Sequence, residues 1–163
     1  NGFNGNLVFV HDDMATKGSI LPITVSHVYN SYMAGKTFDS SAPVGYGWKL
    51  SVQETLMKEP VDGVEYYKYT DADGTDLYFY HDSTMPNGVY MSEDGYGLTI
   101  TVTSSGATLA DDYGNKKNFN SSGALSSICD VYGNSKIFSY TSVFSSSFLY
   151  SLPAISLMWM SRA

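Results

Sequence analysis

Acidic and histidine side chains gather at two places where they could serve as metal ligands. The first is the run His11–Asp13, and the second combines Asp71–Asp76 with His81–Asp82. A calcium loop of the EF-hand type needs oxygen ligands at alternating positions and glycine at the sixth position. Counted from Asp71, the glycine comes fourth. We therefore expect a hairpin turn with solvated carboxylates and no metal site, with a weak calcium site of the extracellular type as the alternative.

Glutamates are the next candidates, because a glycosidase needs two carboxylates about 5–10 Å apart across a cleft. Glutamates near strand ends more often keep a sheet soluble and guard its edges. The sequence has no Gly-x-Ser-x-Gly elbow and no glycine-rich phosphate loop. We therefore predict no catalytic residue, no cofactor and no enzymatic activity. The four glutamates weighed for the pair are Glu54, Glu59, Glu65 and Glu93.

A cluster of tyrosines offers a candidate ligand surface. Tyrosine has an apolar ring and a polar hydroxyl, so a stripe of such rings could stack on sugars. The same residues also serve cross-strand packing on a half-exposed sheet, which is the interpretation we prefer. The candidate ligand face consists of Tyr67, Tyr69, Tyr78 and Tyr80.

Composition limits the class of protein. The 163 residues carry a formal net charge of −7, and aromatic residues reach 15%, equal to the charged fraction. Disordered chains have few aromatics and many charges, and nucleic-acid binders present basic patches, so we exclude both classes. Cys129 is the single cysteine, which excludes an internal disulfide and a cysteine-built zinc site. We expect it to be a buried, inert thiol on a strand.

The elements that position these residues are predicted to be strands. Leu98–Thr103 alternates strictly between apolar residues and threonine. Trp48, Leu50 and Val52 alternate in the same way, as do the residues from Ile23 to Tyr29. Runs 64–70 and 75–80 flank an Asp-Ala-Asp-Gly turn. We predict an all-β chain, without helices, built as an antiparallel meander of repeated hairpins.

An internal repeat organises the second half of the chain. Residues 111–119 (DDYGNKKNF) match residues 130–138 (DVYGNSKIF) at an offset of 19, and weaker copies begin at 71 and 92. The aspartate side chain can accept N–H bonds from residues further along the turn, and glycine supplies the positive φ. A second turn, Ser121–Gly123, is predicted between the two best copies. The structural turn residues are Asp71, Gly74, Asp111, Gly114, Asn115, Asp130, Gly133 and Asn134.

These motifs resemble a known family. Gly123-x-Leu125 followed by Asp130-x-x-Gly133-Asn134 is similar to the YD repeat of bacterial Rhs and wall-associated proteins. Five pieces earlier in the chain resemble, in the expected order, the module that precedes such repeats. His27 departs from the pattern, since a basic arginine is expected there. The five pieces are Gly5–Val8, the Asp12–Asp13 region, Leu21–Ile23, Tyr29–Ser31 and Gly45–Trp48.

The resemblance implies a structural role. Such proteins wind a long β-sheet into a hollow shell, which in toxin systems encloses a C-terminal toxin, and related repeats in teneurins serve adhesion. The implied organisation is an N-terminal module at 1–62, YD-type hairpin repeats at 63–141 and an atypical tail at 142–163. The implied partners are further repeats and an effector of the same parent chain. The implied location is secreted or on the bacterial cell surface. The family's self-cleavage motif is not carried over, because the sequence contains no Asp-Pro.

The tail departs from the repeat. Residues 137–161 carry no charge, which raises the question of a membrane span. Frequent serines and Pro153 argue against a transmembrane helix, so we expect no membrane partner. The loss of the repeat pattern suggests a truncated or out-of-frame end.

Three functional hypotheses follow from the sequence. The preferred one is a non-catalytic segment of a shell, with unpaired strand edges. The alternative is an extracellular module that binds a glycan or a cell-surface protein through the tyrosine face. A wall-active hydrolase is the weakest of the hypotheses.

Overall fold

The chain folds entirely as β-structure in the part that the structure describes. The computed structural model describes residues 5–16, 20–34, 45–143 and 152–160, and it contains thirteen strands and no helix within these ranges. It follows that none of these residues belongs to a helix that could span a membrane. The predictions of an all-β fold and of an antiparallel meander are confirmed.

A small sheet precedes the repeats. It has the order β1-β2-β3, all antiparallel, with β1 at Val8–Ala15, β2 at Thr24–Asn30 and β3 at Trp48–Leu50. All eight residues of β1 are exposed, so this edge strand contributes little to a core. The better-buried face of β2 carries Ser26, Val28 and Asn30, the opposite set from the residues whose alternation indicated a strand here.

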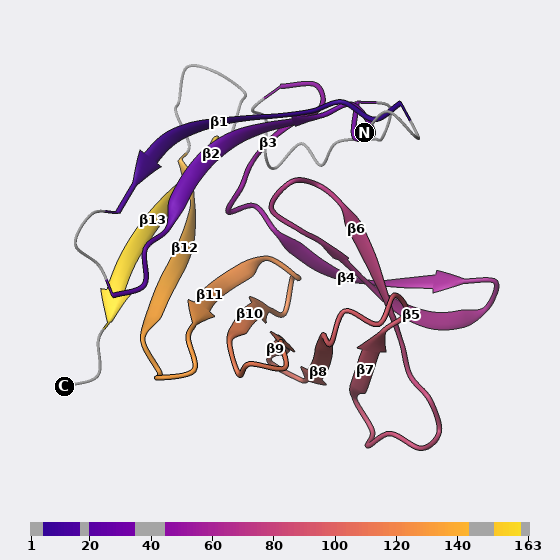
Figure 1. Ribbon diagram of the computed structural model, residues 1–163. Helices are drawn as coiled ribbons and strands as arrows, with labels where there is room; N and C mark the ends of the chain where they lie inside the picture. The colour runs from indigo at the N-terminus through magenta and orange to yellow at the C-terminus, as the bar shows by residue number, and fades with distance from the viewer. Residues whose placement is uncertain (1–4, 17–19, 35–44, 144–151, 161–163) are drawn as a thin grey trace.

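The second sheet is a ten-stranded meander in which each strand pairs with the next along the chain. Figure 1 shows β7 to β11 along the bottom of the view, β4 to β6 on the right, β12 and β13 on the left, and β1 to β3 above them. Its strands are β4 (Thr55–Val61), β5 (Val64–Thr70), β6 (Asp76–Tyr80), β7 (Val89–Ser92), β8 (Thr99–Thr103), β9 (Gly106–Ala110), β10 (Lys116–Asn120), β11 (Leu125–Cys129), β12 (Ser135–Val143) and β13 (Leu152–Met160).

The core of this sheet is built from its concave face. Because side chains alternate between the two faces of a strand, each short strand can place a central residue inside. Every strand from β4 to β12 contributes one fully buried side chain to a single cluster, which Ile23 and Val52 complete. In chain order the nine are Leu56, Tyr69, Phe79, Tyr90, Ile100, Leu109, Phe119, Leu125 and Phe138.

The sheet curls until its first strand meets the beginning of its eighth. The backbone N–H of Leu56 donates to the carbonyl of Gly123 at 2.8 Å, and the N–H of Leu125 donates to the carbonyl of Glu54 at 3.2 Å. An isolated antiparallel bridge joins Thr55 to Ala124 between them. Gly123 is required at this contact, since a Cβ there would collide with the carbonyl of Leu56.

The tail extends the meander. Backbone pairing joins β12 to β13 over nine residue pairs, from Ser135 with Met160 to Val143 with Leu152. Residues 152–160 therefore form a strand, although the repeat pattern is lost in this stretch. Residues 144–151 and 161–163, which belong to the atypical tail named above, lie outside the described residues.

We predict that removing one ring from the concave cluster destabilises the fold strongly. Phe79 is fully buried, so Phe79→Ala should lower the free energy of unfolding by about 3–5 kcal/mol, as cavity-forming aromatic deletions do. Tyr80 is the next residue and points to the opposite face, so Tyr80→Ala is the matched control and should cost clearly less. Urea unfolding followed by circular dichroism measures both. Equal losses would contradict the assignment of the concave face as the core.

Candidate functional site

The repeat turns share one hydrogen-bonded geometry. Asp111 Oδ1 accepts the backbone N–H groups of Tyr113 and Asn115, both at 2.9 Å, and its Oδ2 accepts the Asn115 side-chain amide at 2.8 Å. Asp130 makes the same three bonds to Tyr132 and Asn134, at 3.0, 2.8 and 2.7 Å. The amide of the asparagine holds the pKa of each aspartate below its usual range, against a smaller opposing effect of burial.

Glycine completes each turn with a positive φ. Gly74, Gly114 and Gly133 have φ values of 85°, 90° and 88°, a region that L side chains adopt only with strain. Each glycine N–H donates to the carbonyl of the aspartate three residues earlier. The offset of 19 residues therefore corresponds to a full hairpin unit. Because these turns close alternate hairpins of a meander, they all lie along the same edge of the sheet, the one formed by the strand ends.

The turn predicted at Ser121–Gly123 has the same geometry, with asparagine in place of the aspartate. Asn120 Oδ1 accepts the N–H groups of Ser122 and Ala124, both at 3.0 Å, and Gly123 follows with a φ of 80°. The turn therefore begins one residue earlier than predicted, at Asn120. The signal was available, since Asn and Asp form the same side-chain turn.

The first repeat turn differs because the N-terminal module covers it. Asn30 Nδ2 donates to the carbonyl of Asp73 at 2.9 Å, and the Lys49 ammonium donates to the carbonyl of Asp71. A Cβ on Gly74 would lie 2.5 Å from the sulfur of Met33, so the module packs directly on the turn. Asn30, Lys49 and Met33 thus bind the backbone of Asp71–Thr75 at three points.

Covering this turn perturbs its charges. Burial, followed by the neighbouring Asp73 carboxylate, raises the pKa of Asp71 to about 6. Lys49 is 4% exposed, and the same desolvation lowers the pKa of its ammonium. The burial of Lys49 could not be predicted from the sequence, because its partner, the carbonyl of Asp71, lies 22 residues away along the chain.

A buried polar network lies just inside the contact between β4 and β11. Glu54, which is 4% exposed, accepts a hydrogen bond from the Tyr69 hydroxyl and is held by Lys117 Nζ at 2.9 and 2.7 Å. Lys117 Nζ also lies 2.8 Å from the Tyr69 oxygen. Burial and then the Glu54 carboxylate raise the pKa of Tyr69, so the phenol stays protonated and keeps donating. This network occupies Glu54, one of the four candidate glycosidase residues.

Each of the other three glutamates has its own partner elsewhere on the sheet. Glu59 pairs with Lys68, Glu65 pairs with Lys58 and accepts from the Tyr90 hydroxyl at 2.6 Å, and Glu93 interacts with Tyr66. The structure thus gives these carboxylates structural partners on the sheet and does not bring them together as a pair.

The four candidate ligand tyrosines do not share one surface. Residues directly opposite one another in an antiparallel pair point to the same face. Tyr67 is opposite Phe79, whereas Tyr78 is opposite Lys68 and Tyr80 is opposite Tyr66. Tyr67 and Tyr69 therefore face the concave interior, and Tyr78 and Tyr80 face outward. Tyr69 is only 3% exposed, which removes it from any ligand-binding surface.

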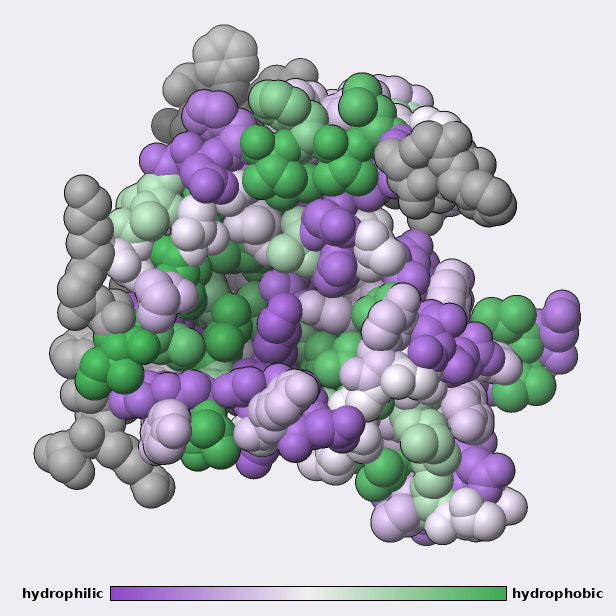
Figure 2. Space-filling view, viewed as in Figure 1, coloured by the Kyte–Doolittle hydropathy of each residue, from purple (hydrophilic) through white to green (hydrophobic). Residues whose placement is uncertain are grey.

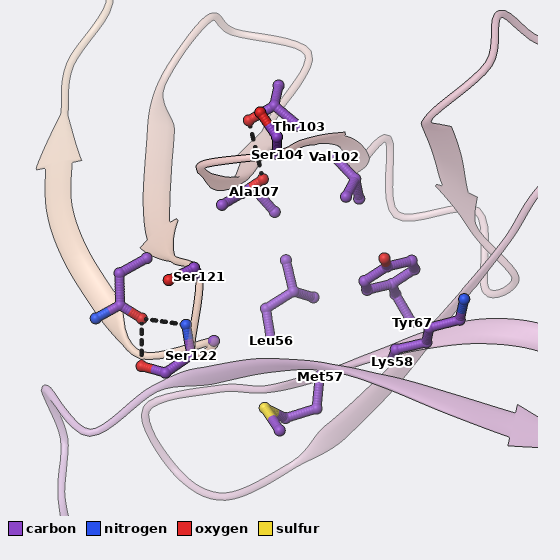
Figure 3. A pocket seen from close by; sticks show the side chains of 13 residues that line it. Leu56, Met57, Lys58, Tyr67, Val102, Thr103, Ser104, Ala107, Ser121 and Ser122 are labelled. Carbon is purple, nitrogen blue, oxygen red and sulfur yellow. Dashed lines mark hydrogen bonds between the residues drawn. The ribbon is translucent and has the colours of Figure 1, made fainter.

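A cavity of about 360 Å³ opens at one end of the curled sheet. Figure 3 shows Leu56 and Tyr67 projecting into it from β4 and β5, opposite Val102 and Ala107. Hydroxyl groups of the turns after β8 and β10 border it, and Lys58 and Tyr67 are the titratable residues among its described lining. The cavity is apolar with a hydroxyl rim.

A second cavity, of about 300 Å³, opens at the opposite end. Tyr69, Lys117 and Leu109 line it beside the aspartates of two repeat turns. Figure 2 shows apolar side chains filling the recess in the middle of the view, between the small sheet above and the strands below. Tyr69 and Lys117 of the Glu54 network thus line the second cavity, whereas no residue of this network lines the first.

The remaining candidates lie apart from these cavities. The Asp13 carboxylate bridges His11 Nδ1 at 3.2 Å and His27 Nδ1 at 2.5 Å on the exposed small sheet. No group of three His, Cys, Asp or Glu side chains is arranged to hold a metal ion in the described ranges. Cys129 lies on β11 as expected, but it is half-buried, 3.6 Å from the Asn118 amide.

We predict that Asn120 acts as an aspartate equivalent. Asn120→Ala removes the acceptor of two backbone N–H bonds and should lower the free energy of unfolding by about 1 kcal/mol. Asn120→Asp keeps the acceptor oxygen and should leave the stability close to that of the wild type. Urea titrations compare the two variants, and a loss in Asn120→Asp as large as in Asn120→Ala would refute the role.

The raised pKa of Asp71 predicts a pH dependence. The folded state holds this proton to about pH 6, whereas an unfolded aspartate releases it near pH 4. The stability contributed by the group is therefore complete below pH 4 and is lost as the pH rises to about 6. Asp71→Asn keeps an acceptor oxygen and should abolish this component of the loss.

The measurement is the urea midpoint at pH values from 4 to 7. Asp111→Asn is the matched control, since the pKa of Asp111 is lowered and its titration lies below this window. The assignment fails if the difference between the wild type and Asp71→Asn does not change between pH 4 and 6.

Comparison with known proteins adds one result for the N-terminal half. No curated protein matches the chain. The family match begins at the first residue and ends at Phe79 in β6, so it takes in both the small sheet and the repeat turn that Asn30, Lys49 and Met33 cover. Residues 1–79 match the family model described as "Domain of unknown function (DUF6531)".

Proposed function

We propose that this chain is a non-catalytic structural segment of a secreted or surface-attached bacterial YD-repeat protein. In this proposal it forms part of a β-shell that encloses or presents a C-terminal effector of the same parent chain. The observation that carries the proposal is the way in which successive repeat turns pack on one another.

Two of the turns each cover a glycine of the turn before them, whereas Gly74 is covered by Asn30 and Met33, and Gly95 has no neighbour within 4 Å of its Cβ position. A Cβ on Gly114 would lie 3.1 Å from the Val131 side chain, and a Cβ on Gly97 would collide with the Asp112 carboxylate. Asp112 and Val131 occupy the same second position of their turns. At Gly133 a Cβ would meet no described atom within 4 Å, so the same contact is open at the last turn. This arrangement supports a sheet that grows by adding further hairpins of the same kind.

The small sheet supports the same proposal. Leu7, Phe9, Val10 and Met14 on and beside β1 are each more than half exposed. Figure 2 shows apolar side chains along the top of the molecule, over the small sheet. Monomeric proteins rarely leave several large apolar side chains uncovered on an edge strand, because such an edge pairs with other chains. In the proposed shell this edge is covered by other parts of the parent.

The isolated chain should therefore associate with itself. Light scattering after gel filtration should detect oligomers, and a hydrophobic dye should fluoresce on binding. Val8→Lys combined with Val10→Lys should reduce both signals by placing charges on the β1 edge. Ser105→Lys combined with Ser139→Lys adds the same charge at exposed sites elsewhere and should leave both signals unchanged.

A monodisperse monomer that binds no dye would overturn the shell proposal. The alternative of a glycan- or surface-binding module has no support from the four tyrosines first considered, because they lie on two faces. Other tyrosines, on the repeat turns, are better placed for such a role.

A further inference from the structure

The repeat turns present the most exposed aromatic rings in the described part of the chain. Tyr113 and Tyr132 are 83% and 86% exposed, although most tyrosines of the sheet are partly or fully buried. Both occupy the third position of an Asp-x-Tyr-Gly-Asn turn. Tyr96, in the preceding turn on the same edge, is 63% exposed. Packing does not explain these three rings, because they project away from the core.

The rings are held by rigid backbone. The N–H of Tyr113 and that of Tyr132 donate to the turn aspartates at 2.9 and 3.0 Å, and the two glycines that follow have nearly equal φ values. The two turns therefore hold their tyrosines in equivalent orientations relative to their hairpins. A ligand that stacks on these rings would meet a site already ordered, which lowers the entropic cost of binding.

The space between the two rings is also apolar. Val131, the residue before Tyr132, lies over Gly114, the residue after Tyr113, and it is 56% exposed. We call the surface formed by Tyr113, Gly114, Val131 and Tyr132 the turn strip. Its residues come from two neighbouring repeat turns on the same edge of the sheet, and Asp112, beside Tyr113, lies over Gly97, which follows Tyr96 in the chain.

Strand spacing sets the distance between the rings. The two turns are two strands apart, and neighbouring strands are about 4.8 Å apart, so equivalent positions repeat at about 10 Å. Sheet twist rotates the second ring relative to the first by about 40–50°. In an extended β-1,4-linked glycan, equivalent sugar faces recur with each disaccharide, at a similar length, and such chains accept a gradual twist.

Charge and size restrict the ligand further. Asp112 is exposed beside Tyr113, the preceding turn exposes Glu93 and Asp94, Lys116 is an exposed cation near the strip, and the protein carries a net charge of −7. Anionic polymers are therefore disfavoured, whereas neutral sugars can donate hydroxyl groups to these carboxylates. A stable protein interface needs about 800 Å² on each partner, which a strip one turn wide does not offer.

We propose that the turn strip binds a neutral, linear β-1,4-linked glycan, with sugar faces stacked on Tyr113 and Tyr132. The inference does not rest on the shell proposal, since it concerns a surface of the chain as it stands. It places the binding surface on the turn edge, at residues that differ from the four strand tyrosines.

Calorimetric titration of the purified chain tests this proposal. Chitohexaose or cellohexaose should bind saturably, and chitobiose should bind more weakly, because it spans one ring only. Maltohexaose, which is α-linked and coiled, should bind at least tenfold more weakly than the better β-linked hexamer. Tyr113→Ala and Tyr132→Ala should each weaken binding about tenfold, through the loss of one stacked ring.

Tyr46→Ala is the matched control, because Tyr46 is 72% exposed but lies in the N-terminal module. It should leave affinity unchanged, and all three variants should keep the thermal midpoint of the wild type. The proposal is overturned if neither β-linked hexamer binds saturably, if both strip variants bind like the wild type, or if Tyr46→Ala causes the same loss. Self-association that is weakened by the strip variants, without glycan binding, would instead identify the strip as a protein contact.

Discussion

The meeting of β4 with the start of β11 is the constraint on which the rest of the structure depends. A meander of short strands has no intrinsic reason to stop curling at a given radius. Two backbone hydrogen bonds and the close approach at Gly123 fix that radius. The concave face can then be filled by one large side chain from each strand. Without this contact the same nine side chains would cover one face of an open sheet and remain half exposed.

The Glu54 network shows how this contact is made specific. A buried ion pair adds little net stability compared with apolar packing, but leaving one partner unpaired is costly. Glu54 precedes β4, whereas Lys117 lies on β10, 63 residues further along the chain. Any curl that separated these strands would leave a buried carboxylate without its cation. The network therefore disfavours alternative registers more than it strengthens the observed one.

Local features of the sequence were sufficient to predict the strands and most turns, because alternation and the Asp-Gly pattern act over a few residues. Features that depend on the pairing register of the strands could not be predicted from the local sequence. The turn at Asp71–Thr75 pairs odd-numbered residues of β5 with odd-numbered residues of β6. This parity sends Tyr67 inward and Tyr78 outward, and no local pattern reveals it. The burial of Lys49 and the role of Glu54 likewise depend on partners distant in sequence.

The N-terminal module and the repeats differ in how they treat the same turn. At Asp71–Thr75 the second and third positions are Ala72 and Asp73, which are small enough for Asn30 and Met33 to reach the backbone. At the last turn those positions are Val131 and Tyr132, which are large and exposed. The same turn geometry therefore has two uses. Small side chains at the second and third positions allow the small sheet to pack on the turn, whereas large side chains there form an exposed surface. The choice of two residues in a fixed turn therefore decides whether that edge of the sheet is closed or open to a partner.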